Sequence, residues 1–348
     1  MSAERREASV LAVDDVHETS AQALRIALAA SAGFTLGQLA GWDFPFLPSL
    51  IAVQLLSAGR TVDLRRAIGF VILMAVGCSI SLFISLAFAD RPLTLTLTIG
   101  LVIFLEFLAL ARGQAAASIF LITTSFVPLM AISSLDLAYA LVHDLVVGSI
   151  LALLLILLIH ALLPTRGHAD EQGGAKRVSE SAPIAAALAN TGVLISLFVY
   201  FMGSGTPTSI IVIMVTATTI LQQTAVAGRG AAFGLILGNV AGGIAATFAY
   251  LLVSLLPSAA FLFLVVLLFG LIFGAKIAAA EKMAPIYAVG AATFLTVLGL
   301  GLSPLPQDSG TLFLSRVSTV IVASLYTIGV ASVLRWLFLE RSRSGDRG

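Results

Sequence analysis

The fold class of this chain is decided by residues 93–110, LTLTLTIGLVIFLEFLAL. The only ionisable side chain in this stretch is Glu106, and the arginines Arg91 and Arg112 lie just beyond its two ends. A membrane hydrocarbon core about 30 Å thick is crossed by a helix of about 20 mainly apolar residues. Residues 93–110 therefore predict a transmembrane helix.

The rest of the chain has the same composition. Of its 348 residues 59% are hydrophobic and only 11% are charged, and the mean hydropathy is +1.06, whereas soluble domains have roughly 25% charged residues. This composition excludes a soluble globular protein, and nothing resembles a patch for binding nucleic acid. The single cysteine, Cys78, lies in an apolar run, which excludes an internal disulfide and a Cys-based metal site. We expect no metal and no cofactor.

Twelve apolar stretches predict an all-α polytopic membrane protein with two parallel six-helix repeats. The spans are expected near 21–40, 44–58, 67–88, 93–110, 115–132 and 138–162, and then near 184–202, 208–222, 231–255, 259–274, 284–301 and 316–338. The domain organisation follows: a cytoplasmic N-terminal segment 1–20, a first repeat 21–163, a cytoplasmic linker 164–183, a second repeat 184–338 and a cytoplasmic tail 339–348. Residues 1–20 lack the apolar core of a signal peptide.

The positions of Lys and Arg predict the orientation, because these residues are retained on the cytoplasmic side. With the N-terminus inside, 16 of the 19 Lys and Arg residues lie on the inner side, Arg91 and Arg316 lie outside, and Arg25 falls within the first span. We therefore expect a multi-pass protein of the bacterial inner membrane with both termini in the cytoplasm.

The proposed repeat rests on matched positions in the two halves. Three residues recur 165 positions later: Gly69 as Gly234, Gly77 as Gly242 and Pro92 as Pro257. Six spans per half would make the repeats parallel, related by an axis along the membrane normal. The alternative is that a glycine-rich membrane chain produces such matches by chance.

Three short motifs resemble a known family. They are ALRIALA at 23–29, GWDFPFLPSL at 41–50 and RAIGF at 66–70. Together they resemble the fusaric-acid-resistance and aromatic-acid-exporter family of bacterial inner-membrane proteins. The resemblance implies proton-driven efflux of aromatic carboxylic acids or related compounds, often beside a periplasmic adaptor protein. Members of the family commonly have sizeable cytoplasmic domains, whereas this chain has only a short linker, as expected of a membrane-only branch.

Two charged residues lie inside predicted spans at similar depth. Glu106 precedes Arg112 by six residues, and Arg25 lies about five residues into the first span from the same side. A charge at the centre of a span costs about 2.5–3.5 kcal/mol on insertion scales, so each needs a reason. We predict an Arg25–Glu106 pair, with Glu106 as a proton-coupling carboxyl. The alternatives are a static ion pair that locks two helices, or an Arg25 that reaches the lipid headgroups.

Other polar residues mark two further regions. On the outer side His143, Asp144 and Arg316 are expected to form a cluster at similar depth, with ordinary interfacial solvation as the alternative. The short spans 44–58 and 208–222 occupy corresponding positions and begin at proline, a pattern that points to a transporter's binding site. Their polar residues are candidates for the substrate path, unless they only satisfy their own backbone; these are Gln54, Ser57, Thr216, Thr219 and Gln222.

The leading functional prediction is an exporter of aromatic or other weak organic acids, or of related toxic amphiphiles, driven by protons. One alternative is a non-transporting subunit that anchors a periplasmic adaptor protein. A membrane enzyme is the weaker alternative, because the chain has no HExxH, GxSxG or Cys-based motif. The expected partners are the lipid bilayer, a small organic acid and the adaptor, without nucleic acid, and a homo-oligomer is left open.

Overall fold

The structure, a computed structural model of the chain, describes residues 2–58, 64–114, 116–164, 183–204, 229–279 and 283–303. The regular elements in these ranges are ten α-helices, which are α1 (Ser2–Leu39), α2 (Leu47–Ala58), α3 (Leu64–Ala87), α4 (Pro92–Ala111), α5 (Ala117–Ser133), α6 (Leu135–Leu162), α7 (Pro183–Ser204), α9 (Arg229–Leu255), α10 (Ala259–Ala279) and α11 (Ala284–Leu302). Seven of them are long and apolar enough to cross a membrane, and Leu47–Ser57 and Ala117–Ser133 are shorter apolar helices.

These helices confirm the expected all-α polytopic membrane protein. Ten of the predicted spans coincide with them, although α1 extends back to Ser2 through the segment expected to precede the first span. The predicted spans 208–222 and 316–338, nearly all of the linker and the tail 339–348 lie outside the described residues.

Proline and glycine mark several helix ends. Pro92 opens α4, where its missing N–H is not needed, and Gly113 follows the end of α4 with a φ of 87°. Gly41 has a φ of 71° just after α1. Glycine adopts this left-handed conformation without steric cost, which lets the chain turn sharply after each helix.

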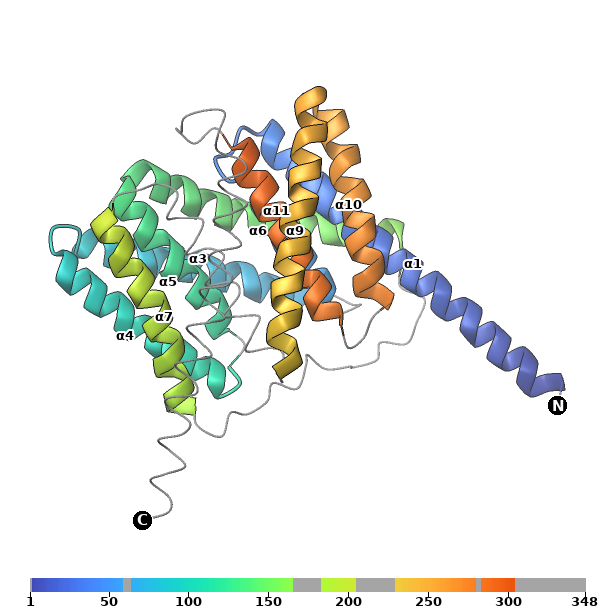
Figure 1. Cartoon of the computed structure of the whole chain (residues 1–348), viewed down its shortest axis with the longest axis horizontal. Helices are drawn as coiled ribbons and strands as arrows, with labels where there is room; N and C mark the ends of the chain where they lie inside the picture. The colour runs from blue at the N-terminus through green and yellow to red at the C-terminus, as the bar shows by residue number, and fades with distance from the viewer. Residues whose placement is uncertain are drawn as a thin grey trace, which may run out of the picture.

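The helices form two groups, and each group contains one helix from the other half of the chain. Helix α7 packs on α4 and so joins α3, α4 and α5, which we call the α4 group; α1 packs on α10 and so joins α9, α10 and α11, which we call the α10 group. Figure 1 shows α4, α5 and α7 on one side of the molecule and α1, α9 and α10 on the other. Helix α6 contacts α1 as well as α3 and α5, so it joins the two groups.

Small residues allow close packing inside the α10 group. A Cβ added at Gly238 would lie 2.6 Å from the carbonyl oxygen of Ile286, and one at Gly274 would lie 2.8 Å from the carbonyl oxygen of Ala23. Helices in lipid associate through such close contacts, because the surrounding hydrocarbon is as apolar as their side chains. The pairs α9–α11 and α1–α10 are therefore held by backbone approach.

Helix α2 is a short, largely buried element among α1, α6 and α11. Its 12 residues span about 18 Å, too short for the hydrocarbon core. Gly37 approaches Pro45 and Gly33 approaches Ser49, so α2 runs antiparallel to α1. The apolar residues Leu50, Ile51, Ala52, Val53 and Leu56 are buried.

Candidate functional site: the polar residues within the helices

Glu106 is a buried carboxylic side chain in α4. It is 8% exposed, and its neighbours Ile103, Phe107 and Leu110 on the same helix are buried apolar residues. Glu106 lies five residues before Ala111, the last residue of α4, which corresponds to about 7.5 Å along the helix. The carboxyl group is therefore inside the apolar layer but near one of its edges.

The hydroxyl of Thr124 contacts Glu106 and a second hydroxyl, that of Ser81. Thr124 of α5 donates a hydrogen bond of 2.8 Å to Oε1 of Glu106, and the hydroxyl of Ser81 in α3 lies 3.4 Å from that of Thr124. Gly77 lies one turn before Ser81, and a Cβ there would be 2.7 Å from Oγ1 of Thr123. The glycine thus lets α3 approach α5 and bring Ser81 to Thr124.

The second oxygen of Glu106 has no hydrogen-bond partner among the described residues. This atom, Oε2, is buried. An unpaired carboxylate in apolar surroundings is costly, whereas a protonated carboxyl could use Oε2 as an O–H donor. The arrangement suits a group that takes up and releases a proton as its surroundings change.

Arg25 does not meet Glu106, so the predicted ion pair is wrong. The Nη1 atom of Arg25 lies 3.0 Å from Oε1 of Glu18, and Nε donates a 2.9 Å hydrogen bond to the carbonyl oxygen of Leu163. The sequence predicts a similar depth for the two residues, but α1 packs in the α10 group and α4 in the other group. Depth along a helix does not determine which helices are neighbours.

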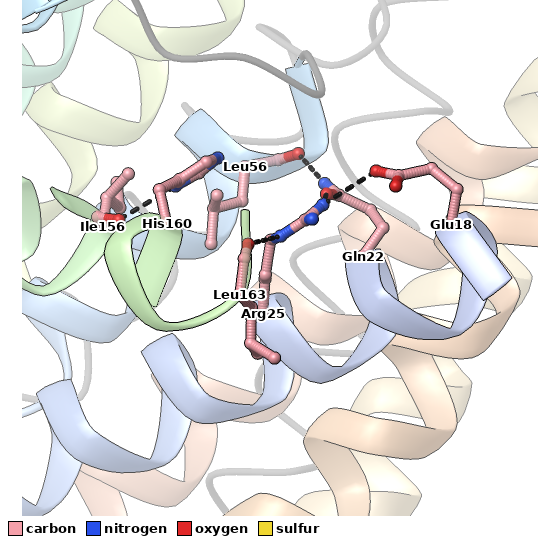
Figure 2. A network of polar contacts seen from close by, with 7 residues as sticks. All are labelled: Glu18, Gln22, Arg25, Leu56, Ile156, His160 and Leu163. Atoms are coloured by element: carbon pink, nitrogen blue, oxygen red, sulfur yellow. Dashed lines mark hydrogen bonds and ion pairs between the residues drawn. The ribbon is translucent and has the colours of Figure 1, made fainter. Parts of the chain in front are cut away.

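Arg25 instead ties together the ends of two helices, as Figure 2 shows. Leu163 is the C-cap residue of α6, so its carbonyl is one that the helix itself cannot pair. Gln22 accepts a 3.1 Å hydrogen bond from Nη1 of Arg25 and donates one of 2.8 Å to the carbonyl oxygen of Leu56, near the end of α2. Arg25 is 0% exposed, which also rules out the alternative in which it reaches the headgroups.

The predicted outer cluster is only partly described. Asp144 is buried and accepts hydrogen bonds from the backbone N–H of Phe44 at 2.9 Å and from Nδ1 of His143 at 3.0 Å. The His143 ring also meets Trp42 edge to face, with ring centroids 5.9 Å apart. Asp144 therefore anchors the turn that leads into α2, while Arg316 lies outside the described residues.

Only two of the predicted substrate-path residues, Gln54 and Ser57, lie within the described part of the chain. Gln54 is exposed on α2, and the Ser57 hydroxyl donates to the carbonyl oxygen of Gln54 at 3.0 Å. Ser57 thus satisfies its own helix backbone, as the alternative interpretation expected. Thr216, Thr219 and Gln222 lie outside the described residues.

Several polar residues of these sites were missed by the sequence analysis. Thr124 lies in an apolar stretch where a threonine is unremarkable, and Glu18 and Gln22 looked like the polar end of the N-terminal segment. The signal for the latter two was their spacing: Glu18, Gln22 and Arg25 fall on one face of a helix at intervals of four and three residues.

Comparison with known proteins gives one match. The family described as "Protein of unknown function (DUF2955)" matches residues 22–159, the part of the chain from α1 to α6. No curated protein and no solved structure matches the chain. The similarity is therefore to an uncharacterised family, and it covers the segment that contains Arg25, Glu106 and Asp144.

Proposed function

We propose that this chain is a proton-coupled exporter of small organic acids, aromatic acids among them, in the bacterial inner membrane. The observation that supports the proposal is Glu106, a buried carboxyl with one oxygen bonded to Thr124 and the other unpartnered among the described residues. Ionisable residues inside membrane spans commonly mark proton or substrate pathways. The substrate class comes from the family resemblance of the three motifs at 23–29, 41–50 and 66–70.

The proposal includes twelve spans in two parallel repeats, with both termini in the cytoplasm. In it the short helix α2 crosses the hydrocarbon core only together with the residues that flank it. Contacts in the two halves support the proposal. Helix α1 packs on α10 as α7 packs on α4, and these pairs are counterparts if each half has six spans. A Cβ at Gly77 would lie 2.7 Å from the Thr123 side chain, and one at Gly242 would lie 2.9 Å from that of Thr293. Two related halves could rock against each other to alternate access.

In this mechanism Glu106 releases its proton to the cytoplasmic side. The end of α4 that lies nearest to Glu106 precedes Arg112, which the distribution of basic residues places inside. A proton that enters from outside neutralises Glu106, and its release to the cytoplasm accompanies the outward movement of substrate. Coupling requires that binding and protonation favour opposite open states of the protein.

The test is the substitution Glu106→Gln, which keeps the size and shape of the side chain but is permanently neutral. Cells loaded with labelled benzoate are assayed for efflux with and without an uncoupler, and exchange is measured in proteoliposomes without a gradient. We expect the variant to lose uphill efflux and to retain exchange. The matched control is Asp136→Asn, which removes an exposed carboxylate in the first turn of α6.

Two results would contradict the proposal. Wild-type efflux that is insensitive to the uncoupler would remove proton coupling, and normal uphill efflux by Glu106→Gln would remove this residue from the mechanism. Loss of both efflux and exchange in Glu106→Gln, with normal protein levels, would assign Glu106 to substrate binding instead.

A further inference from the structure

Within the described residues, Arg25 has two N–H donors, both on Nη2, that no protein group accepts. Its Nε binds the carbonyl oxygen of Leu163, and its Nη1 serves both Glu18 and Gln22. The Nη2 atom is buried and has no partner among the described residues. An arginine that is 0% exposed normally has its donors satisfied, because each unpaired one costs free energy. The edge of the guanidinium formed by Nη1 and Nη2 is therefore only half used.

The carboxylate at this edge, that of Glu18, cannot approach Arg25 freely. Glu18 belongs to the same helix as Arg25 and precedes it by seven residues, about 10.5 Å along the axis. Both side chains must reach along α1 to meet, and the contact is between Nη1 and Oε1 at 3.0 Å. A carboxylate that is free of α1 could approach end-on and bond to Nη1 and Nη2 together, which is the geometry that arginine favours.

We propose that Arg25 is the binding site for the carboxylate group of a small organic acid, and that Glu18 occupies the site when this ligand is absent. Only the role of this site in transport rests on the proposed function. That its ligand is a carboxylate follows from the chemistry of Arg25 and from the Glu18 carboxylate that it binds. Glu18 is 13% exposed beside the fully buried Arg25. The route to Arg25 is therefore the place that the Glu18 carboxylate now fills.

The surroundings of Arg25 favour replacement of the Glu18 carboxylate by the ligand over the binding of both carboxylates together. The carbonyl ends of α6 and α2 lie around the guanidinium through Leu163 and through Gln22, and helix C-termini repel anions. A second anion beside Glu18 would be repelled, whereas replacing one carboxylate by another leaves the charge of the site unchanged. The ligand gains the bond to Nη2, and the Glu18 carboxylate leaves Arg25.

Replacement of Glu18 by the ligand would also change the contacts within α1. With ligand bound, the link from Glu18 to Arg25 is broken, while Arg25 and Gln22 still hold the ends of α6 and α2. Ligand binding therefore removes one contact within α1 without separating the helices at the site.

The test is the binding of benzoate to the purified full-length chain in detergent, measured by isothermal titration calorimetry. Removing the internal competitor by Glu18→Gln should tighten benzoate binding by about tenfold or more, because a hydrogen bond to a charged group is lost only from the free protein. Asp90→Asn, an exposed carboxylate in the turn between α3 and α4, should leave the affinity unchanged. Benzamide, which has the same ring and no charge, should not compete.

Arg25→Lys provides the second arm, because lysine keeps the charge but cannot form a bidentate bond. It should weaken benzoate binding at least tenfold, and Arg25→Lys protein is accepted only if it elutes as a single species of wild-type size. Equal benzoate affinity in Glu18→Gln and wild type would overturn the proposal, as would binding that survives in a folded Arg25 variant. If Arg25→Lys does not fold, the Glu18→Gln and Glu18→Ala affinities decide alone.

The outcomes separate this proposal from the proposed function. Benzoate binding in detergent needs no proton gradient, so a failure of proton coupling leaves this measurement intact. Conversely, uphill efflux can depend on Glu106 while benzoate binding is insensitive to Glu18. That result would remove Arg25 as the carboxylate site and leave the exporter proposal in place.

Discussion

Replacing Gly238 by alanine should force α9 and α11 apart. The added Cβ would lie 2.6 Å from the carbonyl oxygen of Ile286, whereas ordinary contacts begin at 3.4 Å. The local gap must therefore open by 3.4 − 2.6 = 0.8 Å. The neighbour is a backbone atom of a packed helix, so it cannot rotate away as the end of a side chain can.

The magnitude follows from the contacts that this opening weakens. A radial gap of about 0.5–1 Å loses a quarter to a half of each contact, and each contact is worth about 0.1–0.2 kcal/mol. A patch equivalent to one buried leucine has about 40–60 contacts, which gives about 1–6 kcal/mol. Overpacking in cores typically costs about 1–3 kcal/mol, and we expect Gly238→Ala to fall in that range.

The assay is thermal unfolding of the purified chain in detergent, measured as the fraction that stays monodisperse after heating. The expected loss lowers the apparent Tm by about 1–4 °C, because the unfolding entropy of 348 residues is about 0.7 kcal/mol per kelvin. The matched control is Gly69→Ala in α3, where an added Cβ meets nothing within 4 Å. There alanine should be neutral or stabilising, since glycine inside a helix costs about 0.5–1 kcal/mol. Equal Tm values for the two variants would refute the reasoning from backbone approach.

Two further predictions concern the carboxyl site and the orientation. Thr124→Val should lower the free energy of unfolding by about 1–3 kcal/mol, because Oε1 of Glu106 loses its donor. Thr124→Ser keeps the hydroxyl and should recover most of this loss. Equal stability of the Val and Ser variants would show that the hydrogen bond is unimportant. A cysteine placed at Gly173 in a cysteine-free background should resist an impermeant thiol reagent in intact spheroplasts and react after permeabilisation; labelling of intact spheroplasts would reverse the topology.

The helices themselves could be predicted from the sequence. Residues 93–110 were expected to cross the membrane, and α4 is observed at Pro92–Ala111. Hydropathy and length are local properties, so a window of about 20 residues suffices to find a span. The helix ends at Pro92 and Gly113 follow in the same way from the backbone conformations of proline and glycine. The burial of Glu106 followed from its place inside an apolar run.

Only the tertiary structure decided which polar groups meet. The sequence predicts matched depths for Arg25 and Glu106, yet Arg25 binds Glu18 and Leu163 while Glu106 binds Thr124. The depth of a residue is set by its position along its own helix, but its partners depend on which helices are neighbours. That arrangement is set by packing, in which glycines such as Gly238 allow approach and α1 joins the α10 group. The contacts between different helices, such as that of Arg25 with Leu163, join residues far apart in the chain, and no local pattern encodes them.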